Sequence, residues 1–314
     1  GSSTINGMVY MRGHREDFDQ WRRFGNPGWG YDDVLPYFKK AEDNERGSDA
    51  YHGAGGPLGV SDVPRHELAD AFVEAGLQAG FPLNQDFNGE SQDGFGYNQL
   101  TIRKGRRSST ATAYLRPNRS RANLKVIIDA LATRILFRGR EAIGVEFRQR
   151  GNVRSILARR EVIVSGGTFN SPQLLQVSGC GPAEHLRGLG IPVVAELPGV
   201  GGNLQDHFNA SLSYRCSKPI TLSDLLNNPL RQLAVGVRYI LFRDGMMATG
   251  ANFASGFIRT DQTLPAPDIT LTLSLWSRAK YGRSRGKVAL HPFSSFSVQM
   301  TLLHPDNRGT VRIT

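Results

Sequence analysis

Cysteine is nearly absent from this sequence. The 314 residues include only Cys180 and Cys216, which lie far apart in the chain. This excludes a disulfide framework, and no cysteines or histidines have metal-ligand spacing, so we predict no metal site. Such sparse cysteine suits a reducing compartment, and we therefore expect the protein in the cytoplasm.

Long apolar runs are absent as well. The longest are of strand length, such as residues 162–164, whereas a bilayer span needs about 20 apolar residues. This argues against a membrane-spanning helix and leaves peripheral attachment, at the inner membrane, as the alternative to a purely cytoplasmic protein. The chain starts at Gly1 without an initiator Met or a secretory leader, which fits either a cloning remnant or the cut edge of a larger protein.

The motifs of self-contained catalysis are missing too. The sequence has no Gly-x-Gly-x-x-Gly fingerprint, no P-loop, no Gly-x-Ser-x-Gly elbow and no His-Glu-x-x-His motif. None of its seven histidines pairs with another at metal spacing. We therefore expect the histidines to be structural or exposed, and we assign no catalytic residue within this chain.

The net charge of +10 is the strongest bulk feature that is present. Such a charge fits either attraction to phosphate groups, in nucleic acid, membrane or cofactor, or a solvated basic surface. The Arg and Lys are dispersed apart from a cluster at 103–107, which lacks the interleaved aromatic residues of a single-strand binder. The composition favours a solvated surface and no nucleic-acid partner.

Hydrophobic spacing predicts helices in the first third of the chain and mainly strands from residue 124 onward. Helices are expected to begin at Asp17 and to cover Val34–Ala41, His66–Ala79 and Leu230–Phe242. Residues 108–115 fit either a strand or a short helix. Strands are expected over Leu124–Asp129, in a hairpin of Thr133–Phe137 with Ala142–Phe147, and over Ser155–Ala158, Ile269–Leu275 and Phe296–Leu303.

The segment from Arg160 to Leu175 is the most informative one. It predicts a buried strand, then the glycine pair 166–167, then a helix with Asn170 or Ser171 as its cap and Pro172 in its first turn. A strand that leads through glycines into a helix N-terminus is typical of a doubly wound α/β element that faces a nucleotide. A plain strand–turn–helix without a ligand is an equally good reading of the spacing.

Five stretches of the sequence resemble the glucose–methanol–choline (GMC) flavoprotein oxidoreductases. They are "GSSTINGMVYMRGHREDFDQW", "GRRSSTATAYL", "VIVSGGTFNSPQLLQVSGCGP", "LPGVGGNLQDH" and "DFNGESQDGFGYNQ". The last is closer to the choline-dehydrogenase and aliphatic-alcohol-dehydrogenase branch than to the sugar oxidases. Together they extend the resemblance over essentially the whole chain.

This resemblance implies a mixed α/β fold, in which a doubly wound FAD-binding domain is interleaved with a substrate domain built on an antiparallel sheet. We expect residues 1–210 to be mainly FAD-binding domain with interleaved substrate-domain segments, and 211–314 to be mainly substrate domain. In the family, a dinucleotide fingerprint precedes the first stretch and a catalytic histidine lies near the C-terminus. The chain is therefore expected to be a middle piece that lacks both.

The resemblance also names cofactor residues. The turn of Gly1, Ser2, Asn6 and Gly7, with Val9 beside it, is expected against the FAD pyrophosphate and flavin, because only glycine lets backbone N–H groups approach a diphosphate so closely. At the adenine end the expected residues are Ala132, Ser165 and Gly166. Two alternatives stay open: Asn6 as a helix cap, and the Gly166 pair as a tight packing site.

Ile5 stands where some relatives carry a histidine that bonds to the flavin, so non-covalent FAD is expected. The implied activity belongs to an oxidoreductase acting on CH–OH groups: it oxidises a primary alcohol, choline or aliphatic, to an aldehyde by hydride transfer to FAD and passes the electrons to an acceptor such as a quinone. The alternatives are an oxygen-using oxidase of the same family and an inert fragment that binds flavin or anions. His207 is tempting as a catalyst, but its family counterpart is not catalytic. No oligomeric state is predicted.

Overall fold

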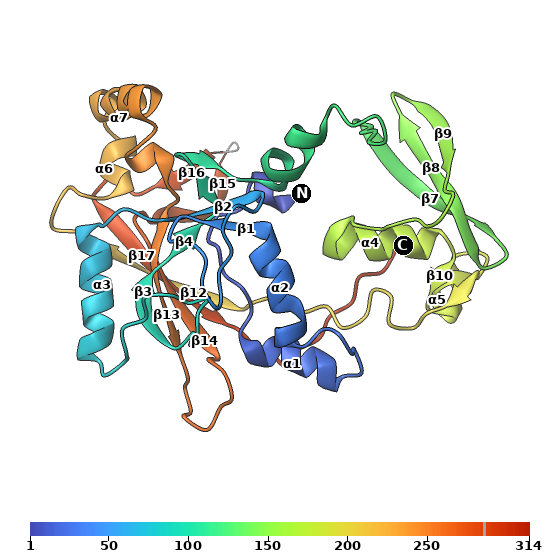
Figure 1. Cartoon of the computed structure of the whole chain (residues 1–314), viewed down its shortest axis with the longest axis horizontal. Helices are drawn as coiled ribbons and strands as arrows, with labels where there is room; N and C mark the ends of the chain where they lie inside the picture. The colour runs from blue at the N-terminus through green and yellow to red at the C-terminus, as the bar shows by residue number, and fades with distance from the viewer. Residues whose placement is uncertain (285–286) are drawn as a thin grey trace. The chain divides into compact units, whose positions relative to one another are not determined.

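The computed structural model describes residues 1–284 and 287–314 (Figure 1). The chain forms two compact units, which we describe separately. The first unit comprises residues 1–121 and 207–304, and the second comprises 122–206 and 305–314. The assignment of residues 1–210 and 211–314 to cofactor and substrate domains stays a prediction.

The first unit is built on a five-stranded antiparallel sheet. Its strand order is β12 (Asn209–Arg215), β17 (Ser295–Leu302), β14 (Ile269–Ser274), β13 (Asn252–Ile258) and β3 (Gly94–Tyr97). The strands predicted over 269–275 and 296–303 are therefore confirmed. Hydrophobic alternation identified them because each buries one face and leaves the other nearer to solvent.

Helix α3 (Glu67–Gln78) contacts this sheet and closes the core of the first unit. Its residues Ala69 and Val73 pack with Phe95, Phe253 and other buried side chains. A Cβ added at Gly76 would lie 2.3 Å from Cγ of the Phe95 ring, so the helix can approach the sheet only with glycine there. The predicted helix over 66–79 is confirmed, with His66 as its N-cap.

Further helices, strands and turns complete the first unit. Helix α2 (Tyr31–Ala41) begins three residues earlier than predicted. Residues 108–115 were compatible with a strand or a short helix, and the structure forms a helical turn there, Ala111–Leu115. The remaining elements of the first unit are α1 (Arg15–Arg23), β1 (Glu42–Asn44), β2 (Leu58–Asp62), β4 (Gln99–Leu100), β5 (Ile102–Arg103), β6 (Arg106–Arg107), α6 (Leu222–Leu226), α7 (Pro229–Phe242), β15 (Arg278–Ser284), β16 (Lys287–Leu290) and the 3-10 turns Ser2–Thr4, Arg116–Asn118 and Met246–Ala248.

The second unit contains a three-stranded antiparallel meander and a helix. The predicted hairpin is confirmed: β7 and β8 are joined through Gly139, whose φ of +59° suits a tight turn. Helix α4 contacts the meander, where Ser178 Oγ accepts a hydrogen bond from Ile135 N at 2.9 Å. Its elements are β7 (Ala130–Arg138), β8 (Glu141–Gln149), β9 (Asn152–Leu157), α4 (Gly167–Val177), β10 (Cys180–Gly181), α5 (Ala183–Gly188) and β11 (Ala195–Glu196).

Two predicted strands of the second unit are not formed. Residues 124–129 and 160–165 belong to no strand, and no strand among the described residues pairs with either of them. Ile163 is 77% exposed, so the second segment is not buried as predicted. The apolar composition was identified correctly, but a strand also needs a neighbour to hydrogen-bond with, and composition does not supply one.

The start of helix α4 also differs from the prediction. The helix begins at Gly167, with Gly166 as its N-cap and no side chain capping it, so neither Asn170 nor Ser171 is the cap. Pro172 lies inside the helix and not in its first turn. The reason is the backbone of Gly167, whose φ of +85° makes the turn within the glycine pair and lets the helix start earlier.

Candidate functional site

The predicted flavin-side residues lie at the start of the first unit, in an exposed turn. Residues Ser2–Thr4 form one 3-10 turn, in which Ser2 O accepts hydrogen bonds from the backbone N of Ile5 and Asn6 at 2.9 and 2.8 Å. The side chain of Asn6 then accepts a hydrogen bond from Met8 N at 3.1 Å. Asn6 therefore shapes the turn through its own side chain and caps no helix.

Arg107 fastens this turn to the rest of the unit. Its Nη1 donates to the backbone O and the Oδ1 of Asn6, both at 2.8 Å, and to Ser3 O at 3.3 Å. Ser3 Oγ lies 3.0 Å from Thr110 Oγ1 and accepts a hydrogen bond from Thr110 N. Sequence reasoning assigned Arg107 to the solvated basic cluster, because nothing in the local pattern signals a partner 101 residues away.

One close backbone approach follows the turn: a Cβ added at Gly250 would lie 3.1 Å from Gly7 O. A Cβ added at Gly7 would make only an ordinary contact, 3.4 Å, with the side-chain Nδ2 of Asn252. Val9 then forms a bridge with Leu100, which fixes the chain beyond the turn. The turn is thus held firmly from behind, while Gly1, Ser2, Asn6 and Gly7 remain exposed and nothing lies within 4 Å of a Cβ built on Gly1.

The three predicted adenine-end residues lie in the second unit. Ala132 is exposed on β7, where it pairs with Phe147, and Ser165 and Gly166 are exposed at the start of α4. A Cβ on Gly166 would lie 3.1 Å from Asn170 Cβ, so local packing accounts for this glycine without a ligand. The packing alternative is therefore supported at Gly166, and the ligand role there stays a prediction.

A buried ionic cluster in the first unit escaped the sequence analysis. Glu42, whose side chain is fully buried, contacts Arg12 Nη2 at 2.6 Å and His52 Nδ1 at 2.9 Å. The other ring nitrogen of His52 lies 2.7 Å from Asp86 Oδ2. Burial alone would lower the pKa of His52, but its hydrogen bonds to Asp86 and Glu42 raise it to about 9.

These contacts make His52 a charged structural anchor at neutral pH. Burial opposes ionisation of Glu42 and Asp86, yet hydrogen bonds from His52 keep the pKa of both carboxyl groups below the usual value. The cluster joins elements distant in sequence, so no spacing rule could have found it. His14 and His66 are structural in a simpler way, because each caps a helix with its ring nitrogen.

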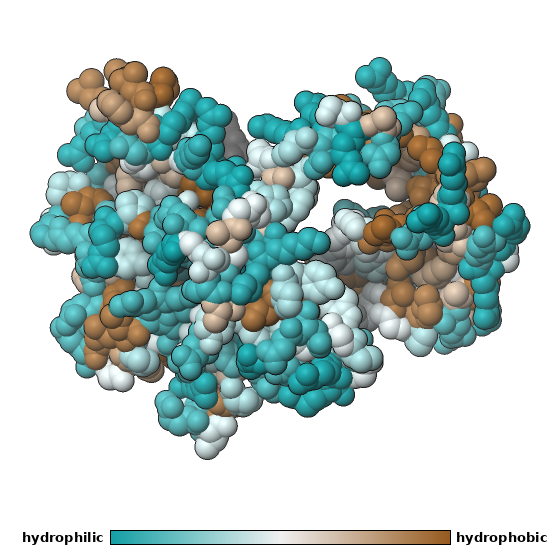
Figure 2. All heavy atoms as spheres, viewed as in Figure 1, coloured by the Kyte–Doolittle hydropathy of each residue, from teal (hydrophilic) through white to brown (hydrophobic). Residues whose placement is uncertain are grey.

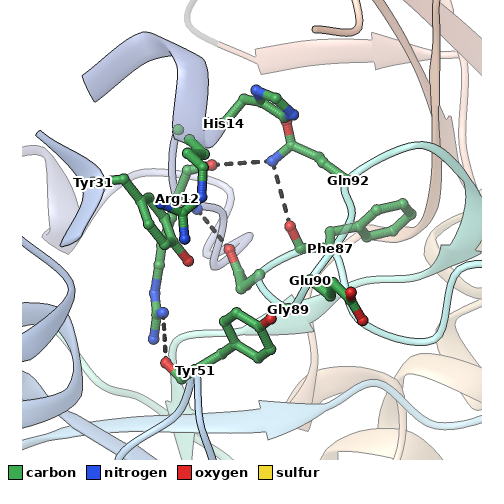
Figure 3. A pocket seen from close by; sticks show the side chains of 11 residues that line it. Arg12, His14, Tyr31, Tyr51, Phe87, Gly89, Glu90 and Gln92 are labelled. Carbon is green, nitrogen blue, oxygen red and sulfur yellow. Dashed lines mark hydrogen bonds between the residues drawn. The ribbon is translucent and has the colours of Figure 1, made fainter. Parts of the chain in front are cut away.

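Beside the cluster is a pocket of about 270 Å³ (Figure 3). Its polar groups bond to one another: Arg12 Nη1 donates to Tyr51 O at 2.8 Å, and Gln92 Nε2 donates to Arg12 O at 3.2 Å and to Phe87 O at 3.4 Å. Arg12 N donates to Asn88 Oδ1 at 2.7 Å. These hydrogen bonds tie several of the lining residues to one another and to the backbone.

Comparison with known proteins identifies the family. Residues 1–209 match the model of the GMC oxidoreductases, so the chain belongs to the GMC oxidoreductase family. It is 48% identical to the mitochondrial choline dehydrogenase of Homo sapiens over 270 residues, which cover 86% of this chain and 45% of that protein. It is 47% identical to the oxygen-dependent choline dehydrogenase of Brucella ovis, again over 86% of this chain and 49% of that protein.

Solved structures support the same fold. A formate oxidase variant from Aspergillus oryzae, determined to examine FAD modification, matches with a TM-score of 0.85 and 25% identity. The match covers 98% of this chain and 58% of that one. The mixed α/β fold with an antiparallel-sheet unit, inferred from the sequence, is confirmed. The chain spans about half the length of the curated relatives it matches.

Proposed function

We propose that this chain forms part of an FAD-dependent alcohol oxidoreductase and supplies the turn against which the flavin and pyrophosphate lie. The observation that carries the proposal is the turn of residues 1–9, which is clamped from behind by Arg107 and exposed in front. Such a rigid glycine-containing turn offers backbone groups to a diphosphate at close range. Gly1, Ser2, Asn6, Gly7 and Val9 would hold the cofactor there.

The second unit would bind the adenine end through Ala132, Ser165 and Gly166. The first backbone N–H groups of α4 have no partner within the helix, as in any helix, and no side chain caps them, which favours a negatively charged or polar group there. The support here is weaker than in the first unit, because local packing already accounts for Gly166.

The proposed reaction is the oxidation of a primary alcohol, choline or aliphatic, to an aldehyde. The alcohol loses a hydride from carbon and a proton from oxygen, and FAD, when bound, accepts the hydride. The names of the relatives support choline-type alcohols. We assign no catalytic residue in this chain, and its location in the cytoplasm stays a prediction.

The two candidate functions differ in the molecule that accepts electrons from the reduced flavin. We propose a dehydrogenase that passes electrons to a quinone-type acceptor, and the oxygen-dependent name of the Brucella ovis relative favours an oxygen-using enzyme as the second candidate. Peroxide formed under air in step with alcohol consumption would support the second candidate. Dye reduction that is equally fast under nitrogen and air, without peroxide, would support the first.

Flavin titration tests the cofactor proposal on the chain itself. We expect added FAD to acquire a protein-bound absorbance spectrum and quenched fluorescence. Acid precipitation should release it unmodified, because Ile5 offers no atom for a covalent bond to the flavin. Absence of any flavin signal, before and after FAD is added, would overturn the proposal in favour of an inert chain.

Activity of the 314-residue chain by itself is expected to be negligible. It spans about half the length of its relatives, and none of its histidines is assigned to catalysis. Dye reduction with choline or octanol should therefore stay at the level of free FAD. Measurable turnover above that level would show that a catalytic group lies within residues 1–314.

A further inference from the structure

The hydrogen bonds that tie the pocket beside Arg12 together leave out one buried phenol. Tyr31, the first residue of helix α2, lines this pocket and is only 5% exposed. Its backbone N donates to Asp19 Oδ1 at 3.2 Å, but its hydroxyl has no hydrogen-bond partner among the residues that the structure describes. A buried hydroxyl without a partner costs free energy, so such groups are normally matched by water or by a ligand.

Two more hydrogen-bond donors line the same pocket. Tyr51 is half-buried, and within the described part of the chain its hydroxyl likewise has no partner. His14 Nδ1 accepts a hydrogen bond from Glu16 N at 3.1 Å, where it caps helix α1. Burial lowers the pKa of His14, so its ring is neutral at pH 7 and carries its proton on Nε2. Burial raises the pKa of Tyr31, so that hydroxyl keeps its proton as well.

The two arginines of the pocket wall are already paired. The guanidinium of Arg12 contacts Glu42 at 2.6 Å. Arg15 Nη1 contacts Asp32 at 2.9 Å. The carboxamide nitrogens in the wall donate to backbone oxygen atoms. The donors that remain for a ligand are therefore uncharged: the two phenol hydroxyls and the imidazole N–H.

One carboxylate limits the charge that a ligand can carry. Figure 3 shows Tyr31 and Glu90 on opposite sides of the pocket, with Tyr51 between them. Glu90 is exposed, and its negative charge repels a dianion more strongly than a monoanion. Figure 2 shows mainly hydrophilic residues over the position that α1 occupies in Figure 1. A small charged molecule therefore meets a polar surface on this side of the first unit.

We propose that this pocket binds a small monocarboxylate through Tyr31, Tyr51 and His14. A carboxylate has about four lone-pair positions on two oxygens and can accept from all three donors at once, whereas an alcohol oxygen accepts at most two hydrogen bonds. Hydrogen bonds to a charged acceptor are also stronger than those between neutral groups. The pocket volume of about 270 Å³ lies below the range of roughly 300–1,000 Å³ that suits drug-sized ligands, which favours a short-chain acid.

Titration calorimetry with acetate at pH 7 tests this proposal. We expect saturable binding of acetate, and no saturable signal from sodium chloride at the same ionic strength. Inorganic phosphate should bind more weakly than acetate, because its second charge is opposed by Glu90. Lack of saturable acetate binding, or tighter binding of phosphate, would overturn the proposal. Neither flavin nor alcohol is needed, so failure here would leave the proposed oxidoreductase function untouched.

Tyr31→Phe removes only the buried hydroxyl. Acetate affinity should fall by about tenfold, because a hydrogen bond to a charged group is lost. The melting temperature without acetate should not fall, because this hydroxyl has no partner in the described chain, whereas a merely structural role would lower it. The matched control is Tyr37→Phe, the same change on the same helix at a side chain that is 71% exposed. Equal acetate affinities in the two variants would overturn the proposal.

Glu90→Gln should have the opposite effect. Acetate should bind about threefold more tightly, because a like charge leaves the pocket while the side chain keeps its size. Glu74→Gln is the matched control, since it removes the same charge from an exposed position on α3 and should leave the affinity unchanged. An equal gain in both variants would mean that acetate responds only to net charge. That result, or weaker binding in Glu90→Gln, would overturn the proposed site.

Discussion

Strand β14 and residues 160–165 each contain three β-branched residues but differ in their surroundings. β14, in the first unit, pairs with β13 on one side and β17 on the other, and its Leu273 is 1% exposed. Residues 160–165, in the second unit, include three consecutive aliphatic residues, yet no strand of the described chain pairs with them. Composition favours a strand in both places. What separates them is the neighbour that supplies hydrogen bonds and a buried face.

The largest effect that this comparison predicts is in the sheet of the first unit. Leu273→Ala should lower the free energy of unfolding by about 3–5 kcal/mol, because the side chain is fully buried and its truncation leaves a cavity in the core. Tryptophan fluorescence in urea measures this unit specifically, since all three tryptophans, Trp21, Trp29 and Trp276, lie within it. A loss below about 1 kcal/mol would show that this sheet is as loosely held as the segment at 160–165.

The buried cluster of the first unit gives a second large effect, with a defined pH dependence. The pKa of His52 is raised to about 9, so its contribution to stability is complete below about 6.5 and is lost as pH rises through 9. The pKa values of Glu42 and Asp86 are lowered, so their contribution is lost as pH falls below about 4. Stability of this unit should therefore be greatest near pH 5–6.5.

His52→Gln tests that assignment. The variant should cost about 3 kcal/mol near pH 6, because it removes the cation that hydrogen-bonds to buried Glu42 and half-buried Asp86. Its stability should no longer decline between pH 7 and 9. His185→Gln is the control: this residue lies in the second unit and should leave the alkaline decline intact. An unchanged alkaline decline in His52→Gln would mean that another group causes it.

Sequence reasoning succeeded where the signal was local and failed where it was not. The helix at 66–79 and the hairpin around Gly139 were predicted because spacing, a cap or a turn residue stood within a few positions. Arg107 and Asn6 are 101 residues apart, and His52 meets its carboxylates across three separate elements. Chain folding alone brings such groups together, so neither contact leaves a pattern in the sequence.

Cofactor affinity should show an intermediate effect in the first unit. Arg107→Met removes the three hydrogen bonds that clamp Asn6 and Ser3, so the turn loses its fixed shape and FAD affinity should fall by about tenfold to a hundredfold. Arg106→Met is the matched control, since it removes the same charge from the adjacent exposed position. Fluorescence titration with FAD measures both. Equal losses in the two variants would reduce the role of Arg107 to general electrostatic attraction.

The smallest effect belongs to the second unit and returns to residues 160–165. Ile163→Ala should change stability by no more than about 0.5 kcal/mol, because the side chain is 77% exposed and leaves no cavity when it is shortened. Hydrogen exchange read by mass spectrometry is the suitable measurement, since this unit contains no tryptophan. Amides of 160–165 should exchange quickly, and those of β14 slowly, because only the latter donate to neighbouring strands. A cost above about 1 kcal/mol, or slow exchange at 160–165, would mean that the segment has a partner in solution. In that case residues 160–165 and strand β14 would both hydrogen-bond to a neighbouring strand, and they would differ only in how their side chains are packed.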